Sequence, residues 1–131
     1  SNGTDVKLRT YFVEDNPTIR ENLIATLAEL ADVEAVGIAE TETDATQWLT
    51  QNTDAWDLVI VDLFLRQGSG LGVVNALQTR SKNQKLLVLS NYATADVRER
   101  CQQLNADAIF DKSNEIEALI DFCIELNTNK V

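Results

Sequence analysis

Short apolar runs and amphipathic segments alternate five times along the chain. The apolar runs are rich in Val, Ile and Leu and are bounded by polar residues, which is typical of strands buried on both faces of a parallel sheet. Between these runs, apolar residues recur at helical spacing, which predicts helices that lie on the sheet with one face. The alternation predicts an α/β fold with helices on both faces of a five-stranded parallel sheet. The expected strands span residues 8–13, 33–39, 57–62, 85–90 and 108–110.

The sequence also carries start signals for the helices between these strands. Asn16 and Pro17 supply an N-cap side chain and a proline at the first helical position. Thr41 and Asp44 resemble a capping box for the second helix, and Ser113 is expected to cap the fifth. The inward face of the first helix is expected to hold four apolar residues, Ile19, Leu23, Leu27 and Leu30.

Acidic side chains stand where two of the expected strands end. Glu14 and Asp15 close the first apolar run, and Asp62 closes the central run. Because parallel strands point the same way, their carboxyl ends line one crevice at one edge of the sheet. Three carboxylates at one edge repel one another unless a cation lies among them. The pattern therefore predicts a metal site made of these three residues.

Composition restricts the classes of partner and of chemistry. The 131 residues carry a formal net charge of −10, which argues against binding of nucleic acid or of an anionic membrane by this domain. No apolar run approaches the roughly 18 residues that cross a bilayer, and no signal peptide is visible, so a cytoplasmic location is expected. The chain has no histidine, which excludes acid–base chemistry by histidine and argues against zinc.

The length fits one domain with a hydrophobic core of its own. Residues 4–131 are expected to form this domain, whereas Ser1-Asn2-Gly3 resembles the remnant of a cloning tag. Cys101 and Cys123 fall in expected helices on or near the apolar face. They are therefore expected to be buried free thiols.

Two further polar side chains stand at the ends of the fourth and fifth strands. Ser90 ends the fourth strand, and Lys112 ends the fifth 22 positions later. Gly70 stands eight positions after Asp62. With the acidic pair after the first strand, this succession resembles the receiver domains of two-component response regulators, over residues 8 to about 126. The resemblance implies a doubly wound, flavodoxin-like sheet of strand order 2-1-3-4-5, with two helices on one face and three on the other.

The resemblance also implies a role for each of these side chains. Asp62 would accept a phosphoryl group from a histidine of a sensor kinase or of a phosphotransfer protein. Ser90 and Lys112 would bind oxygens of that group. The implied cofactor is Mg2+, which prefers oxygen ligands. Asp15 and Asp62 would bind the ion directly, and Glu14 would bind it through water. The backbone carbonyl of Phe64 would be a further ligand.

A receiver domain is a signalling domain rather than an enzyme, with at most slow loss of its own phosphate. Phosphorylation would switch an interaction surface on the fourth helix, fifth strand and fifth helix, where Arg98, Glu99 and Arg100 are expected to be exposed. This surface would bind a downstream protein or an output domain, or a second copy of the chain in a homodimer.

Three positions depart from the pattern of this family. Ser113, directly after the lysine, and Arg66, four residues after the acceptor acid, replace common prolines. Ile109 stands where many relatives carry Tyr or Phe, whose ring changes rotamer as the hydroxyl of the fourth strand moves. A switch driven by Ser90 is therefore expected to use backbone and loop movement, or Tyr92.

Two aromatic residues are expected to control the lifetime of the phosphorylated form. Phe64 lies two positions after Asp62, and Tyr92 lies two positions after Ser90. In receiver domains, side chains at these places flank the phosphoryl group, and polar ones help to position the hydrolytic water. Two bulky rings are expected to restrict its approach. The other interpretation is that Phe64 packs on its loop and Tyr92 on the fourth helix, with no effect on the rate.

Three other functions fit parts of the sequence. Residues 68–72 read Gly-Ser-Gly-Leu-Gly between a strand and a helix, but they lack the last glycine of the dinucleotide fingerprint. A phosphatase of the haloacid dehalogenase type would need an acid two residues after its nucleophile, where this chain has Phe64. The remaining alternative is a degenerate receiver that binds proteins without being phosphorylated, which the isoleucine at position 109 keeps open.

Overall fold

The structure is a computed structural model that describes residues 6–129. The expected tag remnant at residues 1–3 lies outside these residues. Five strands alternate with five helices, as the apolar pattern predicts. The strands are β1 (Leu8–Val13), β2 (Val33–Ala39), β3 (Leu58–Asp62), β4 (Lys85–Ser90) and β5 (Ala108–Asp111). The helices are α1 (Pro17–Ala31), α2 (Glu42–Gln51), α3 (Gly70–Ala76), α4 (Ala95–Gln103) and α5 (Ile116–Thr128).

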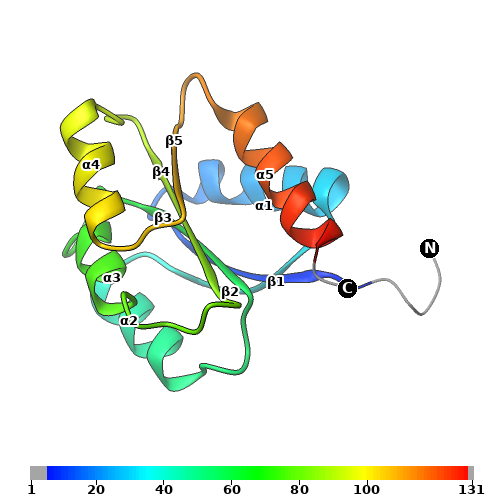
Figure 1. Cartoon of the computed structure of the whole chain (residues 1–131), viewed down its shortest axis with the longest axis horizontal. Coiled ribbons are helices and arrows are strands. Elements are labelled where there is room, and N and C mark those ends of the chain that lie inside the picture. Colours follow the sequence, from blue (N-terminus) through cyan, green and yellow to red (C-terminus); the bar gives the residue numbers. More distant parts are fainter. Residues whose placement is uncertain (1–5, 130–131) are drawn as a thin grey trace.

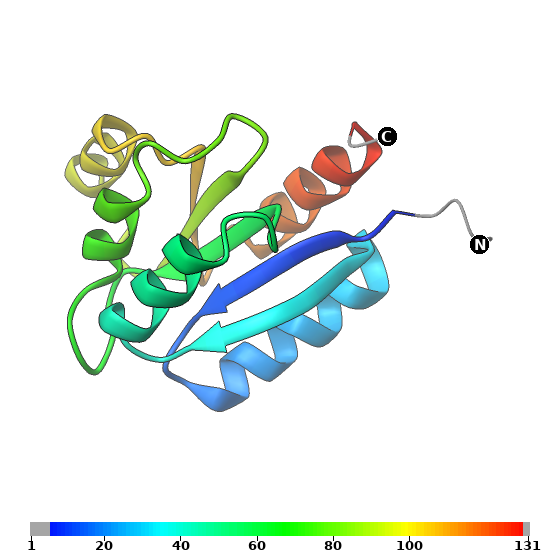
Figure 2. The ribbon, with the colours of Figure 1, turned by 90° about the horizontal axis from the view of Figure 1, so that it is seen from below.

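The strands form one parallel sheet in the order β2-β1-β3-β4-β5, so the predicted fold is confirmed. Figure 2 shows β1 and β2 side by side, with their arrowheads at the same edge of the sheet. β3 lies at the centre of the sheet, and all five of its residues are buried. The chain therefore brings the end of its most enclosed strand to the edge at which the other strands also end.

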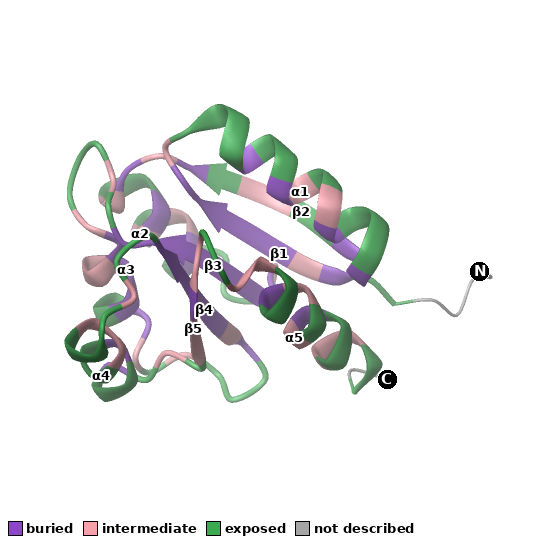
Figure 3. Cartoon of the chain, turned by 90° about the horizontal axis from the view of Figure 1, so that it is seen from above, coloured by how far each residue is buried: buried purple, intermediate pink, exposed green. Residues whose placement is uncertain are grey.

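Helices cover both faces of the sheet, two on one side and three on the other, as predicted. α1 and α5 lie together on one face, whereas α2, α3 and α4 lie on the other (Figure 1). Each face has its own core, built around Leu27 and Leu119 on the first side and around Leu49, Val73 and Cys101 on the second. The central strands are buried between these two layers (Figure 3).

Side-chain caps begin several of the helices where the sequence predicts them. The Asn16 side chain accepts a hydrogen bond of 3.0 Å from the backbone N–H of Ile19, and Pro17 occupies the first turn of α1. Thr41 caps α2 in the same way through the N–H of Asp44, at 3.2 Å. These caps satisfy donors that would otherwise lack a partner at the helix starts.

The buried face of α1 differs from the predicted one. Ile19 and Leu30 are 39% and 52% exposed, so their assignment to the core is wrong. The helix is rotated so that an arginine takes the position next to the sheet, because its guanidinium donates to the carbonyl oxygen of Glu14 at 2.8 Å. The buried residues of α1 are Arg20, Leu23, Leu27 and Ala31.

The predicted cap of α5 is also wrong. α5 begins at Ile116 after Glu115, and no side chain caps it. The N–H of Ser113 instead donates to the carboxylate of Asp111 at 2.7 Å, as does the N–H of Asn114 at 3.1 Å. Ser113 therefore belongs to a turn that leaves β5, because the carboxylate of Asp111 competes for its backbone.

The two cysteines match their prediction. Cys101 in α4 and Cys123 in α5 are free and buried. Burial raises the pKa of the Cys123 thiol to about 12, because the thiolate is poorly solvated in the core. The thiol therefore stays protonated and acts as a small apolar side chain.

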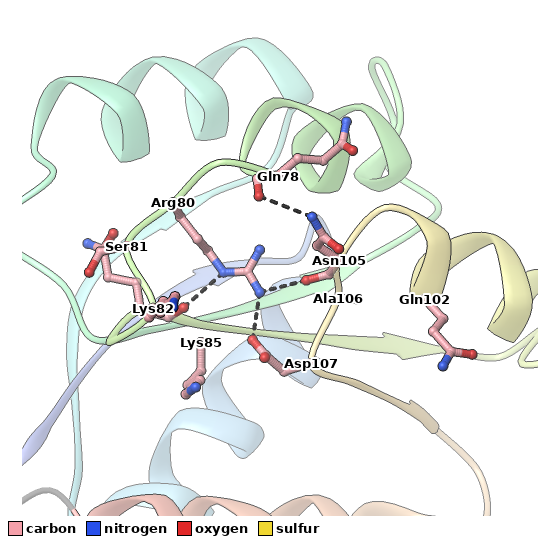
Figure 4. Close-up of a pocket in the computed structure, with 10 residues that line it drawn as sticks. Gln78, Arg80, Ser81, Lys82, Lys85, Gln102, Asn105, Ala106 and Asp107 are labelled. Atoms are coloured by element: carbon pink, nitrogen blue, oxygen red, sulfur yellow. Dashed lines mark hydrogen bonds and ion pairs between the residues drawn. The ribbon is translucent and has the colours of Figure 1, made fainter.

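The loops at the opposite edge of the sheet are joined by one arginine. The side chain of Arg80 is only 8% exposed, and its guanidinium donates to three backbone carbonyls and to the carboxylate of Asp107, which Figure 4 shows beside it. A polar cavity of about 420 Å³ lies between these loops. All of these hydrogen bonds are made to other residues of the protein. Through them, Arg80 joins the loop before β4 to the loop before β5. Its partners are Leu77, Gln84, Asn105 and Asp107.

Within residues 6–129, no helix has the length and apolar character needed to cross a membrane.

Candidate functional site

The site lies at the edge of the sheet where β1, β3, β4 and β5 end. The register places Asp62 beside Leu89 and places Ser90 beside Asp111. Asp62 and Ser90 are the last residues of β3 and β4, whose apolar residues are buried, so the backbone that carries them is fixed by the core. This arrangement brings together side chains from four separate segments, as the sequence predicts for the carboxyl ends of parallel strands.

Three carboxylates converge at this edge. Glu14, Asp15 and Asp62 each offer one oxygen, and these atoms all lie within 4.8 Å of one another. Glu14 and Asp62 are only 4% and 6% exposed, whereas Asp15 is half-buried. An all-oxygen donor set of this kind suits a hard divalent cation such as Mg2+. The convergence predicted from the sequence is therefore present, and the residues fit such an ion.

Lys112 lies between two of these acids. Its ammonium group is 2.6 Å from Oε1 of Glu14 and 2.9 Å from Oδ2 of Asp62. Burial alone would lower the pKa of Lys112, but hydrogen bonds to both carboxylates outweigh it and hold the pKa above its ordinary value. Burial raises the pKa of Glu14, and the hydrogen bond from Lys112 opposes that shift. The lysine therefore remains a cation that compensates part of the negative charge.

Backbone hydrogen bonds position Lys112, although the chain lacks the proline that commonly follows this lysine in the family. The N–H of Lys112 donates to the carbonyl of Ser90 at 3.0 Å, which continues the pairing of β4 with β5. The following turn is held by the Asp111 carboxylate, which accepts from Ser113 and Asn114. Residues 6–129 contain no cis peptide bond. Ser113 thus leaves the lysine in place at the acidic edge.

Ser90 and Asp62 each hold the start of the loop that follows them. Ser90 is fully buried, and its Oγ accepts from the N–H of Tyr92 at 3.0 Å. Oδ1 of Asp62 accepts from the N–H of Phe64 at 3.2 Å. Because the Ser90 oxygen accepts this bond, its own O–H remains able to donate. A Cβ at Gly70 would overlap the carbonyl of Asp62, which explains why a glycine is required there.

The aromatic side chains of the two loops that follow Asp62 and Ser90 contact each other. The rings of Phe64 and Tyr92 pack edge to face, with centroids 5.1 Å apart and planes at 72°. They are 57% and 61% exposed, which is high for side chains of this size. The two loops that leave β3 and β4 are therefore joined at their tips by an exposed aromatic pair.

On the surface formed by α4, β5 and α5, Arg98 is half-buried and not exposed as the sequence predicts. Its guanidinium donates to the carbonyls of Ala93 and Ile109, and it forms an ion pair of 2.7 Å with Glu115. It is half-buried, because it joins the loop before α4 to β5 and to the start of α5. The neighbours Glu99 and Arg100 are exposed, as predicted.

Sequence reasoning missed a group of ion pairs behind the acidic edge. Arg20 donates to the carbonyl of Glu14 at 2.8 Å and to the carboxylate of Glu40 at 2.9 Å. Glu40 also forms an ion pair of 2.9 Å with Arg66, which lies four residues after Asp62. One signal was available: Arg20 stands in helical register with the buried Leu23. A cation in that register requires a buried acceptor.

Comparison with models of protein families and with solved structures places this arrangement in a known family. Residues 11–123 match the model of the response regulator receiver domain. The receiver domain of the Francisella response regulator 1452 is 17% identical, with a TM-score of 0.80 over 95% of this chain and 100% of that one. A LuxR-family DNA-binding response regulator from Staphylococcus aureus is 19% identical, with a TM-score of 0.79 over 92% and 98%.

The response regulator domain of Thermotoga maritima CheB is 13% identical, with a TM-score of 0.79 over 96% of this chain and 100% of that one. At these identities the solved structures show the fold alone. The match to the family model covers most of the chain, and it agrees with the acids, hydroxyl and lysine found at the sheet edge. The chain belongs to the response regulator receiver domains of two-component signalling systems.

Proposed function

We propose that this domain accepts a phosphoryl group on Asp62 from a phosphorylated histidine of a sensor kinase or a phosphotransfer protein. The observation that carries the proposal is the position of the Asp62 carboxylate. It is buried at the end of the central strand and accepts a hydrogen bond from Lys112, and carboxylates of two other residues lie next to it. A carboxylate so placed is a nucleophile whose surroundings can compensate the charge of an anionic donor.

In the proposed reaction an oxygen of Asp62 forms a bond to phosphorus. The bond between phosphorus and the imidazole nitrogen of the donor breaks, and its electron pair leaves with that nitrogen. The ammonium of Lys112 and the hydroxyl of Ser90 donate hydrogen bonds to phosphoryl oxygens. Ser90 ends the strand next to β3, and Lys112 directly follows the next strand along, so neither donor has to be recruited from a distant part of the fold.

The acidic edge is proposed to hold Mg2+. Asp15 and Asp62 would bind it directly, Glu14 would act through water, and the backbone carbonyl of Phe64 would supply a further ligand. When bound, the ion supplies positive charge opposite the phosphoryl oxygens. Asp15 is the most accessible of the three acids, and it has no competing bond to Lys112. Both properties suit Asp15 to bind the ion directly.

Phosphorylation is proposed to change the surface formed by α4, β5 and α5. The new phosphoryl charge would draw Ser90 and Lys112 towards it, which shifts the population between two arrangements. Ile109 has no ring to rotate, but its carbonyl accepts a hydrogen bond from Arg98. We infer that the movement reaches this surface through the β4–α4 loop and Tyr92. The surface would then bind a downstream protein, an output domain or a second copy of the chain.

The acceptor is tested by Asp62→Asn. The amide keeps the shape of the side chain but lacks the nucleophilic carboxylate, so we expect no phosphoryl uptake from acetyl phosphate with Mg2+, while the parent chain is labelled. Circular dichroism should show the same fold for both chains. Labelling of the variant at the level of the parent would remove Asp62 from this role, and an unlabelled parent would favour a degenerate receiver.

The metal site is tested by Mg2+ without phosphate. A ligand that binds only the folded chain stabilises it, so Mg2+ should raise the melting temperature, and Asp15→Asn should reduce that rise. Asp54→Asn is a matched control, because it removes an equal charge from the exposed loop before β3. Equal Mg2+ responses in the two variants would argue against Asp15 as a ligand.

The aromatic pair is tested by the lifetime of the phosphorylated chain. We propose that Phe64 and Tyr92, joined edge to face, restrict the in-line approach of water to the acyl phosphate. Phe64→Asn combined with Tyr92→Glu should therefore lose its phosphoryl group several-fold faster than the parent, as measured by decay of the label. Mg2+ binding should be retained. Equal decay rates would show that the rings pack without any influence on hydrolysis.

A further inference from the structure

The glycine-rich stretch at residues 68–72, which ends the loop after β3 and begins α3, surrounds a carboxylate of the protein itself. The N–H of Ser69 donates to Oε1 of Glu42 at 2.8 Å. A Cβ at Gly68 would overlap the side chain of Glu42, and a Cβ at Gly72 would overlap its carboxylate oxygens. Gly68 also has a φ of +75°, which L side chains rarely adopt. These glycines thus make room for Glu42, and this accounts for the stretch without a nucleotide.

Backbone contacts fasten the same loop to the start of α2. The N–H of Glu42 donates to the carbonyl of Gln67 at 3.1 Å, and Thr41 pairs with Gln67 in a parallel bridge. One residue earlier, Glu40 forms its ion pair of 2.9 Å with Arg66. Three successive residues before and within α2 therefore hold the loop that follows the acceptor acid.

The loop returns to the acidic edge through Ser69. Ser69 pairs with Phe64 in an antiparallel bridge, and the N–H of Gly70 donates to the carbonyl of Leu63 at 2.9 Å. The N–H of Phe64 donates in turn to Asp62. Ser69 thus contacts Glu42 through its N–H and pairs with Phe64, whose carbonyl is the proposed metal ligand.

We propose that Glu42 is a positioning residue for the backbone of Phe64, and thereby for the divalent cation at the acidic edge. This inference rests on the proposed function. A hydrogen bond from a backbone N–H to a carboxylate is roughly twice as strong as one between neutral groups. Glu42 is half-buried, and its position between two glycines leaves its carboxylate little freedom. It therefore holds Ser69 in the place that the pairing with Phe64 requires.

The experiment compares Glu42→Ala with Asp44→Ala by Mg2+ titration. Both variants remove one negative charge from the first turn of α2, but Asp44 is exposed and its side chain holds no part of the β3–α3 loop. We expect the dissociation constant for Mg2+ to rise several-fold in Glu42→Ala relative to Asp44→Ala. Amide hydrogen exchange without Mg2+ should also be faster at residues 64–69 in Glu42→Ala alone.

The isosteric pair Glu42→Gln and Asp44→Asn repeats the comparison with the side-chain volumes kept, so the test stands if Glu42→Ala does not fold. Glu42→Gln should bind Mg2+ more weakly than Asp44→Asn. This inference is overturned if the Glu42 variant and the Asp44 variant of each pair that folds bind Mg2+ with equal affinity. A lower melting temperature of the Glu42 variant would then show a purely structural role, and the proposed function would still stand. A parent chain that binds no Mg2+ would overturn the proposed function and this inference with it.

Discussion

The ammonium of Lys112, held between Glu14 and Asp62, is the interaction on which the functional edge depends. Two buried carboxylates with a third beside them would repel one another strongly if nothing compensated their charge. Lys112 compensates part of it through bonds of 2.6 and 2.9 Å. Removing one partner from a buried ion pair typically costs about 3–5 kcal/mol. In the absence of a bound cation, Lys112 is therefore the group that offsets part of the repulsion among these acids.

The parallel sheet meets this constraint by bringing distant segments together. Lys112 lies 98 positions from Glu14 and 50 from Asp62 along the chain. They meet because β1, β3 and β5 end at the same edge of one sheet, with strands buried on both faces. The loops beyond these ends are then held by contacts of their own: Asp111 holds the turn after Lys112, and Glu42 holds the loop after Asp62.

The sequence predicts the strands and the acidic edge because each depends on local pattern, whereas the strand order followed from the resemblance to receiver domains. The acids, Ser90 and Lys112 directly follow or end apolar runs, so their place follows from the fold. The burial of Arg20 was harder to predict from the sequence. Its partner Glu40 comes close to it only when α1 packs against the end of β2. The cap assigned to Ser113 was wrong for a similar reason: the carboxylate of Asp111 holds residues 113 and 114 in a turn, and α5 begins only after Glu115.

The most direct test of this account is the Mg2+ affinity of Lys112→Met. If Lys112 is the fixed counter-charge of the acidic edge, its loss removes repulsion against a divalent cation, and the dissociation constant for Mg2+ should fall. The expected scale is about tenfold, which corresponds to about 1.4 kcal/mol. Lys82→Met, which removes an exposed lysine at the opposite edge of the sheet, should leave the affinity unchanged. Unchanged or weaker Mg2+ binding by Lys112→Met would contradict the account.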